Sequence, residues 1–456
     1  MKKLIYSFAL LFVFGLGSVA YGQSIAGGRA FSLAVCDNNT VRAWGYNING
    51  QLGIGNNTDS NIPVEVSGMT NAFAVACGDR HSLCLKNDGT VWAWGDNSNG
   101  ALGNGTNISS NVPVPVSLLA GITAVAGGRY HSLALKDDGT VWAWGLNEEG
   151  ALGNGTTISS NVPIPVTTLS GIIAISAGTN FSLALKDNGT VWAWGINEDG
   201  QLGNGTTNSS TVPVQVSSLT GVTAISAGYF HALALKDDST VVGWGFNDNG
   251  QLGTGNYNGS NVPVPVNSIT GVTKISGGRA HSLAIRSDGT IWAWGRNNDG
   301  QLGNGNNTSS NVPVESIIVS DMSSIAAAEA HSLARKSDAT GWGWGNNTNG
   351  QLGNGTNTGS NTPLQITALC PVLSAEPVTE EISSAIYPNP CDGIFTLSLS
   401  AEKGTIEVYS IFGTLIYKCG ITNVQTTIDL TGQPTGLYFA RIFAGKTMIT
   451  EKILIR

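Results

Sequence analysis

A short motif returns along this chain at a constant spacing. The letters DGTVWAWG begin at Asp138, GALGNG follows from Gly150, and close variants of both runs appear in seven copies. The Trp-Gly pairs of these copies, each fifty residues after the last, begin at Trp44, Trp94, Trp144, Trp194, Trp244, Trp294 and Trp344. A fixed period of about 20 to 50 residues is typical of solenoids, propellers and arrays, in which each unit buries its apolar face against its neighbours. The repeat therefore predicts an assembly of similar units rather than a single catalytic core.

Each unit contains four short segments with the pattern of β-strands. In the third unit we expect strands over residues 122–126, 131–136, 141–144 and 162–166. Alternating apolar residues predict the second strand, and the turn after it is expected at Asp137-Asp138-Gly139, because glycine readily adopts a positive φ. Pro163 and Pro165 place the fourth strand at a sheet edge, since proline cannot donate to a neighbouring strand. Four antiparallel strands make a propeller blade, so the sequence predicts an all-β, seven-bladed β-propeller.

The ends of the array indicate how the ring closes. The repeat runs from Ser24 to Leu369, the first unit opens without a preceding strand of the fourth type, and nothing follows the fourth strand of the last unit. We therefore expect the N- and C-terminal strands to complete one shared blade, which would leave no long sheet edge exposed. We expect the closed ring to be a monomer.

Charge and composition exclude some classes of partner. Only 11% of the 456 residues are charged and 61 are glycine, which is typical of a turn-rich all-β protein. The net charge of −8 is spread along the chain without a basic patch, so nucleic acid is not an expected partner.

The N-terminus has the pattern of an export signal. Residues 1–22 combine Lys2 and Lys3 with an apolar run and a small-residue triplet ending at Gly22, as in a secretory signal peptide. The alternative, a membrane anchor, is less consistent with a run this short that is interrupted by glycine. No other apolar stretch could span a bilayer, so we expect no integral membrane segment after cleavage.

The six cysteines all follow this leader. Cys36, Cys77 and Cys84 occupy repeat positions and are expected to be small buried thiols. Cys391 and Cys419 could form one disulfide in an oxidising compartment, although sequence alone does not set the pairing. No CxxC pair or Cys/His cluster has zinc-ligand spacing, so we expect neither a metal site nor a cofactor.

The repeats resemble those of the regulator of chromosome condensation. The matching letters are the runs AGxxHSLAL, DGTVWAWG and GQLGNG, for example at Ala227-Gly228 with His231 and at Gly200 to Gly203. The resemblance implies a seven-bladed propeller over residues 23–369. It also brings two family activities into consideration, nucleotide exchange on a small GTPase and inhibition of a β-lactamase by a secreted propeller. An exported chain is more consistent with the second.

The C-terminal residues form a different module. After a linker rich in Pro, Glu and Ser at residues 370–385, residues 386–456 alternate and turn like a small β-sandwich. This module resembles the C-terminal sorting domain of type IX secretion, whose hallmarks fall at Tyr387, Pro388, Asn389, Pro390, Gly436 and Tyr438. The resemblance implies contact with the type IX machinery and a secreted or outer-surface protein. An ordinary adhesive β-sandwich is the alternative.

The residues that recur are better explained by structure than by chemistry. All five histidines, His81, His131, His231, His281 and His331, stand at one repeat position, where Phe31 and Phe181 complete the set. A catalytic residue is needed once, whereas a side chain that pins a loop by a hydrogen bond would recur in each unit. The twelve tryptophans are likewise expected to pack between blades, with an aromatic sugar platform as the alternative. No Ser/His/Asp set can be singled out, so an enzyme is not expected.

Recognition is therefore expected where the copies differ. The two positions before the histidine slot read Arg29-Ala30, Asp79-Arg80, Arg129-Tyr130, Thr179-Asn180, Tyr229-Phe230, Arg279-Ala280 and Glu329-Ala330. The position after Trp-Gly reads Tyr46, Asp96, Leu146, Ile196, Phe246, Arg296 and Asn346. Successive connections in an up-and-down blade alternate between two rims, so both sets should lie on one rim.

Arginine and aromatic side chains are over-represented in binding hot spots. The candidate binding residues are accordingly Arg29, Arg80, Arg129, Tyr130, Tyr229, Phe230, Arg279, Tyr46, Phe246 and Arg296. We expect a secreted or cell-surface module that binds a protein or glycan through this rim. Regulation or inhibition of a secreted enzyme is the alternative function, and loop variation without any binding role is the alternative explanation of the rim.

Overall fold

The computed structural model describes residues 24–166, 168–317, 320–370, 383–400, 403–444 and 447–456. The chain divides into two compact units, residues 1–370 and 371–456, and each is described by itself. Every regular element in the described residues is a β-strand. The expected signal peptide, residues 1–22, lies outside the described residues, as do residues 371–382 of the expected linker.

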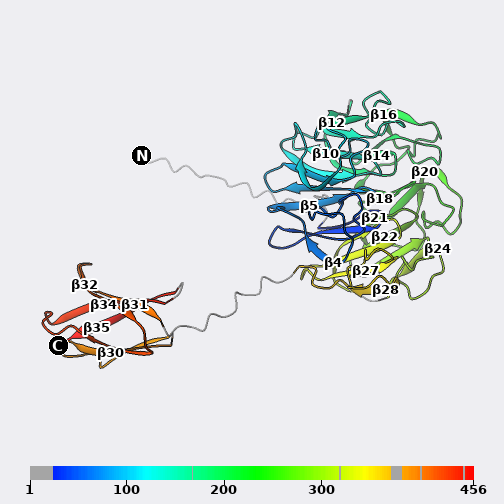
Figure 1. Cartoon of the computed structure of the whole chain (residues 1–456). Coiled ribbons are helices and arrows are strands. Elements are labelled where there is room, and N and C mark those ends of the chain that lie inside the picture. Colours follow the sequence, from blue (N-terminus) through cyan, green and yellow to red (C-terminus); the bar gives the residue numbers. More distant parts are fainter. Residues whose placement is uncertain (1–23, 167, 318–319, 371–382, 401–402, 445–446) are drawn as a thin grey trace, which may run out of the picture. The chain divides into compact units, whose positions relative to one another are not determined.

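The first unit consists of seven four-stranded antiparallel sheets, each built from four consecutive strands (Figure 1). The innermost strands are β1 (Ile25–Gly27), β5 (Ala72–Cys77), β9 (Ile122–Gly127), β13 (Ile172–Ala177), β17 (Val222–Ala227), β21 (Val272–Gly277) and β25 (Met322–Ala327). The second strands are β2 (Phe31–Val35), β6 (His81–Lys86), β10 (His131–Lys136), β14 (Phe181–Lys186), β18 (His231–Lys236), β22 (His281–Arg286) and β26 (His331–Lys336). The third strands are β3 (Val41–Gly45), β7 (Val91–Gly95), β11 (Val141–Gly145), β15 (Val191–Gly195), β19 (Val241–Gly245), β23 (Ile291–Gly295) and β27 (Gly341–Gly345). The outermost strands are β4 (Ser60–Glu65), β8 (Ser110–Pro115), β12 (Ser160–Pro165), β16 (Ser210–Gln215), β20 (Ser260–Pro265), β24 (Ser310–Glu315) and β28 (Ser360–Gln365).

The strand assignments for the third unit are confirmed. Its sheet has the order β12-β11-β10-β9, with Leu133 opposite Ala143 in the central pair. The proline-bearing strand β12 lies at the sheet edge, where a missing N–H costs no ladder bond. Gly139 has a φ of +76° in the hairpin, as the turn requires.

Tryptophan packs each blade against the one before it, as predicted. Trp94 is fully buried in a cluster that also holds Leu33 and Ala43 of the preceding blade. Its indole Nε1 donates to the carbonyl oxygen of Gln51 at 2.9 Å, and the equivalent bond forms in each of the six remaining blades. The apolar burial and the satisfied indole N–H together explain why this letter recurs.

The histidines have the predicted structural role, although they bond a neighbouring blade rather than a loop. His81 Nε2 lies 2.9 Å from Ser132 Oγ in the next blade, and the other four histidines form the same pair with Ser182, Ser282, Ser332 and Ser32. Ser132 Oγ itself donates to the carbonyl oxygen of Ala101, so His81 must donate its Nε2–H. Phe181 packs in one core cluster with Ala232, so at this pair the imidazole and the hydroxyl are both absent. Opposite Phe31 the serine is kept, and Ser82 Oγ donates to the carbonyl oxygen of Gln51 at 2.7 Å.

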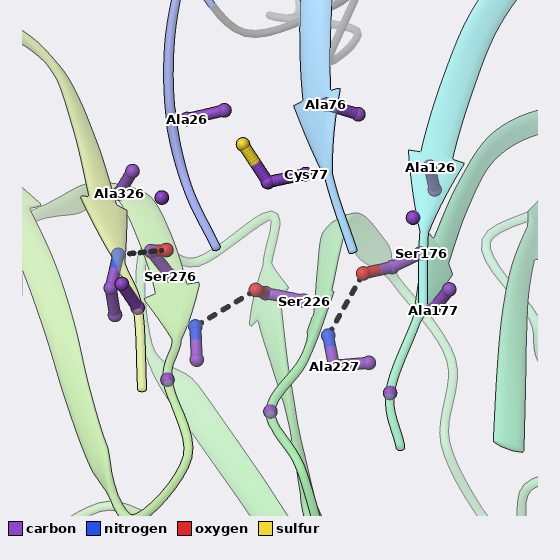
Figure 2. A pocket seen from close by; sticks show the side chains of 18 of the residues that line it. Ala26, Ala76, Cys77, Ala126, Ser176, Ala177, Ser226, Ala227, Ser276 and Ala326 are labelled. Carbon is purple, nitrogen blue, oxygen red and sulfur yellow. Dashed lines mark hydrogen bonds between the residues drawn. The ribbon is translucent and has the colours of Figure 1, made fainter. Parts of the chain in front are cut away.

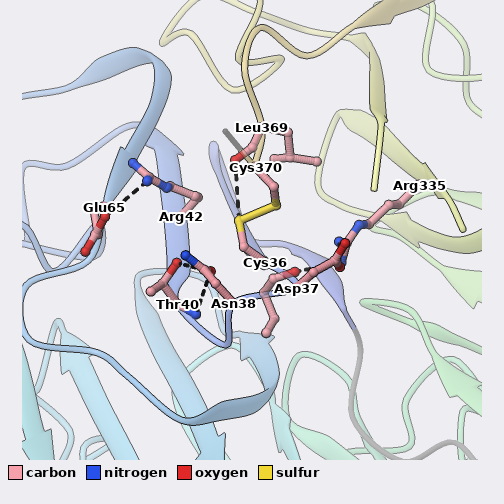
Figure 3. The surroundings of a disulfide bond; sticks show 10 residues. Cys36, Asp37, Asn38, Thr40, Arg42, Glu65, Arg335, Leu369 and Cys370 are labelled. Atoms are coloured by element: carbon pink, nitrogen blue, oxygen red, sulfur yellow. Dashed lines mark hydrogen bonds and ion pairs between the residues drawn. A yellow bond between two sulfur atoms is a disulfide. The ribbon is translucent and has the colours of Figure 1, made fainter. Parts of the chain in front are cut away.

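The ring does not close by a shared blade, and that expectation was wrong. Each repeat begins with an innermost strand and ends with an outermost one, so the first and last blades each own four strands. Side chains join the two blades instead, as Figure 3 shows for Cys36 and Cys370, which form a disulfide across 334 residues. Arg335 donates to the Val35 carbonyl at 2.6 Å and to the Asp37 carboxylate at 2.9 Å.

The cysteine expectations also need correction. Cys36 is a disulfide partner rather than a buried free thiol, and Cys391 and Cys419 are both free. Cys391 forms an isolated β-bridge with Ile455, at the end of strand β35 (Thr447–Ile455), whereas Cys419 lies on β32 (Leu415–Ile421). These strands form opposite edges of one sheet, about 14 Å apart at the usual strand spacing, too far for a disulfide.

The second unit is the predicted small β-sandwich. One sheet contains β29 (Ser384–Tyr387), β30 (Ile394–Leu399) and β33 (Gln425–Asp429), and the other contains β32, β31 (Gly404–Ser410), β34 (Gly436–Ala444) and β35. Their facing sides meet in a core that includes Phe395, Leu397, Ile406 and Val408. Of the residues expected in the linker, Cys370 belongs to the disulfide, and Ser384 and Ala385 begin β29.

The hallmark residues of this module support its sheets. Asn389 Oδ1 accepts the backbone N–H of Leu454, and its amide nitrogen donates to the carbonyl oxygen of Lys452, so the motif is tied to the last strand. Tyr438 is buried and its hydroxyl donates to the carbonyl oxygen of Pro434 at 2.8 Å. The motif thus helps to hold the module's C-terminal strand in place.

Candidate binding rim and channel mouth

The propeller has two rims with different connections. We call rim A the side that carries the short links from innermost to second strands and the long loops from third to fourth strands. Rim B carries the hairpins between second and third strands. On rim A, the backbone N–H of Leu146 donates to the carbonyl oxygen of Tyr130 at 2.9 Å, and the equivalent bond forms in all seven blades. The two sets of variable positions therefore lie side by side on one rim.

Seven variable side chains surround the end of the central channel on rim A. This mouth ring is defined by one repeat position, and Asp79, Arg129, Tyr229 and Glu329 of it line the channel: Arg29, Asp79, Arg129, Thr179, Tyr229, Arg279 and Glu329. Backbone bonds between blades fix its geometry: the N–H of Arg29 donates to Asp79, that of Asp79 to Arg129, and that of Thr179 to Tyr229. Four candidates, Arg29, Arg129, Tyr229 and Arg279, thus meet in one ring.

A buried carboxylate joins two sides of the mouth ring. Asp79, whose side chain is 3% exposed, accepts the hydroxyl of Tyr229 and forms an ion pair with Arg129 Nε at 3.4 Å. Tyr229 belongs to the fifth blade and Asp79 to the second, so this hydrogen bond spans the mouth. Burial, together with the charge of Asp79, raises the pKa of the Tyr229 hydroxyl well above its ordinary value, so it stays protonated and donates.

A second carboxylate joins two arginines of the ring. Glu329 forms ion pairs with Arg29 Nε at 3.2 Å and with Arg279 Nη1. The Glu329 side chain is 14% exposed, while the side chains of Arg29 and Arg279 are 44% and 46% exposed. The ring therefore holds its negative groups inward and turns its guanidinium groups toward solvent.

Three of the aromatic candidates, Tyr229 of the ring with Phe230 and Phe246 beside it, form one cluster. Phe230 makes edge-to-face contacts with Tyr229 and Phe246, with 6.3 Å between ring centroids in each pair. The Arg129 guanidinium lies over the Tyr130 ring at 4.8 Å. Arg80, Tyr46 and Arg296 occupy the same rim but take no part in these ring contacts within the described residues. The candidates thus form a mouth ring with an aromatic cluster on one side, rather than one continuous patch.

Small residues line the channel behind the mouth ring. The cavity has a volume of about 370 Å³, and Figure 2 shows its wall of alanine and serine side chains, with Cys77 among them. Ser176, Ser226 and Ser276 each accept a backbone N–H from the next blade at 2.9 Å. Burial raises the pKa of the Cys77 thiol well above its usual range, so the thiol remains protonated. No group of three His, Cys, Asp or Glu side chains that could hold a metal ion occurs in the described parts of the chain.

The acidic partners of the arginines were not among the sequence candidates. Asp79 and Glu329 stand at the same repeat position as Arg29, Arg129 and Arg279. The presence of both arginine and acidic residues at this one repeat position is the sequence feature from which the ion pairs could have been predicted. A ring of seven blades brings this position together, so opposite charges on it are expected to pair.

Sequence profiles of known families match both units. The RCC1-like domain matches residues 68–383, RCC1 repeats match residues 23–51 and 39–85, and the secretion system C-terminal sorting domain matches residues 385–456. The type IX sorting domain indicates delivery to the extracellular space or cell surface. Among the described residues, no helix has the length and apolar character needed to cross a membrane.

Solved structures with the same fold include human WBSCR16, at 25% identity and a TM-score of 0.66, which covers 72% of this chain and 94% of that chain. A yeast RCC1 (Prp20) structure bound to Kap60 has 22% identity and a TM-score of 0.66, covering 80% and 89%. Prp20p from Saccharomyces cerevisiae has 24% identity and a TM-score of 0.64, covering 75% and 87%. Since the RCC1-like profile covers more than half of the sequence and the propeller fold agrees with it, this chain belongs to the family of RCC1-like domains.

Proposed function

We propose that this protein is a secreted or surface-attached binding module that holds a macromolecular partner on rim A. The observation that carries the proposal is that the recurring residues of the repeat hold the blades together, while the variable residues lie on one rim. The tryptophan of each Trp-Gly pair and the recurring histidines are buried and make hydrogen bonds between blades, whereas the side chains that differ gather around one channel mouth. Arginine and aromatic side chains on such a surface are typical of binding hot spots.

A non-catalytic role is part of this proposal. The five histidines are 0–1% exposed, and burial lowers the pKa of His131 to about 3, so none is available as a general base on the surface. Regulation of a secreted enzyme would be one form of the same binding, recognised by a captured hydrolase that loses activity.

The test is capture of partners from the surface and culture medium of the source cells, together with a glycan panel. The full chain is compared with a rim A variant, Arg80→Ala, Tyr130→Ala and Phe246→Ala, none of which supports Asp79 or Glu329. A rim B variant, Lys136→Ala, Lys236→Ala and Arg286→Ala, is the matched control. We expect the rim A variant to lose the partner at an unchanged Tm and the control to keep it. A partner retained by the folded rim A variant would refute the proposal.

A further inference from the structure

We propose that the mouth ring recognises an acidic loop of a protein partner. This inference rests on the proposed function of rim A and adds the chemistry of the partner. Three arginines and two carboxylates give the ring a formal charge of +1, although the chain as a whole carries −8. The mouth ring is therefore a local cationic site on an anionic protein, which would focus an acidic group toward it.

The arginines are arranged to accept a further anion. Arg29 and Arg129 each use Nε for their ion pair, and Arg279 uses Nη1, so the other guanidinium nitrogens of each side chain remain to donate. All three side chains are 40–46% exposed. The ion pairs hold the guanidinium groups in place, which lowers the entropy cost of engaging a carboxylate.

The surroundings of the mouth limit the size of the acidic group. The long loops of the third, fourth and fifth blades carry five exposed carboxylates, none of them in an ion pair within the described residues: Glu148, Glu149, Glu198, Asp199 and Asp248. Burial and the neighbouring charges of Glu198 and Asp248 raise the pKa of Asp199 above its ordinary value. This acidic arc would repel an extended polyanion lying across rim A. A compact acidic tip flanked by neutral or basic residues would avoid the repulsion.

The aromatic residues favour a peptide over a sugar. Stacking on a sugar needs a free ring face, and fewer are left here because Arg129 lies over one face of Tyr130 and Phe230 packs edge-to-face with Tyr229 and Phe246. Mixed arginine and aromatic contacts of this kind are common at protein–protein interfaces. A protein loop is therefore the occupant that the observations favour.

The experiment measures binding of a fluorescein-labelled peptide, with two adjacent glutamates flanked by neutral residues, to the full chain by fluorescence anisotropy. Arg29→Gln, Arg129→Gln and Arg279→Gln together should weaken binding by about 10-fold or more at low ionic strength. The control, Lys136→Gln, Lys236→Gln and Arg286→Gln, removes the same charge from rim B, where each cation is also paired with an aspartate, and should change affinity little. Asp79→Asn with Glu329→Gln raises the ring to a formal +3 and should tighten binding, which a merely structural role would not produce.

Three results would overturn the inference: no peptide binding by the wild type, equal losses in the two triple variants, or no gain in the Asp79→Asn, Glu329→Gln variant. A heparin oligosaccharide that binds more tightly than the peptide would also overturn it, in favour of an anionic glycan. If the peptide fails to bind while the rim A variant still loses its captured partner, this inference fails and the proposed function stands. If that variant keeps its partner, the proposed function fails.

Discussion

Mild acid should destabilise this propeller through its five buried histidines. Burial lowers the pKa of His81 from its ordinary 6.5 to about 4 and those of His131, His231, His281 and His331 to about 3. Because the folded-state pKa is the lower one, the unfolded chain takes up protons below pH 6.5 that the folded chain excludes. Stability is therefore complete above pH 6.5 and is lost as the pH falls toward 4.

The size of the loss in unfolding free energy follows from the number of buried histidines. At pH 5.5, one unit below the unfolded pKa, each histidine should cost about 1.4 kcal/mol of unfolding free energy. Five would cost about 7 kcal/mol, which is comparable to the whole stability of a typical domain. Urea unfolding between pH 8 and 5.5 should therefore show a steep fall of the midpoint, at pH values where few carboxylates titrate.

The chain supplies its own control for this effect. The variant His231→Phe with Ser282→Ala copies the Phe181–Ala232 pair found between the fourth and fifth blades. It should reduce the loss of stability between pH 8 and 5.5 by about 1.4 kcal/mol, since one buried imidazole is gone. Identical pH dependence of the variant and the wild type would refute the assignment of the acid sensitivity to these histidines.

Three further predictions concern the seam, one hairpin and the mouth. Cys36→Ser with Cys370→Ser opens a 334-residue loop, and the chain-entropy relation gives about 6 kcal/mol as the upper limit of the loss, measurable by urea unfolding of oxidised and reduced protein; an unchanged midpoint would contradict a closing role. Ala339 has a φ of +70° where four other hairpins carry glycine, so Ala339→Gly should stabilise the fold by about 1 kcal/mol, and a lower Tm would contradict this. Tyr229→Phe removes a donor from buried Asp79 and should cost about 1–3 kcal/mol, most of it recovered by adding Asp79→Asn; additive losses would argue against the coupling.

Residues that recur were predictable from sequence because they act within a blade or between adjacent blades. The tryptophan and histidine slots repeat with the strands, so their burial follows from period alone. Contacts that depend on the closed ring were not predictable in this way. The Cys36–Cys370 disulfide and the Arg335–Asp37 pair lie at the seam, where the ring's curvature brings residues some 300 positions apart together.

The mouth shows the same limit within the candidate site. The alternation of connections placed the variable positions on one rim, and the backbone bonds agree with it. The hydrogen bond from Tyr229 to Asp79 joins the fifth blade to the second, with two blades between them, so it depends on the diameter of the ring rather than on any local pattern. Sequence therefore indicated where the arginines lie but not which carboxylates hold them.

Hydroxyl-radical footprinting of the full chain with its captured partner tests the central claim most directly. The claim is that rim A, and not rim B or the sorting domain, meets the partner. Oxidation of Tyr130, Phe230 and Phe246 should fall when the partner is bound, while exposed Phe73, near rim B, and Phe412, in the sorting domain, should be unchanged. Protection of Phe73 or Phe412, with no change at the three rim A residues, would contradict the account.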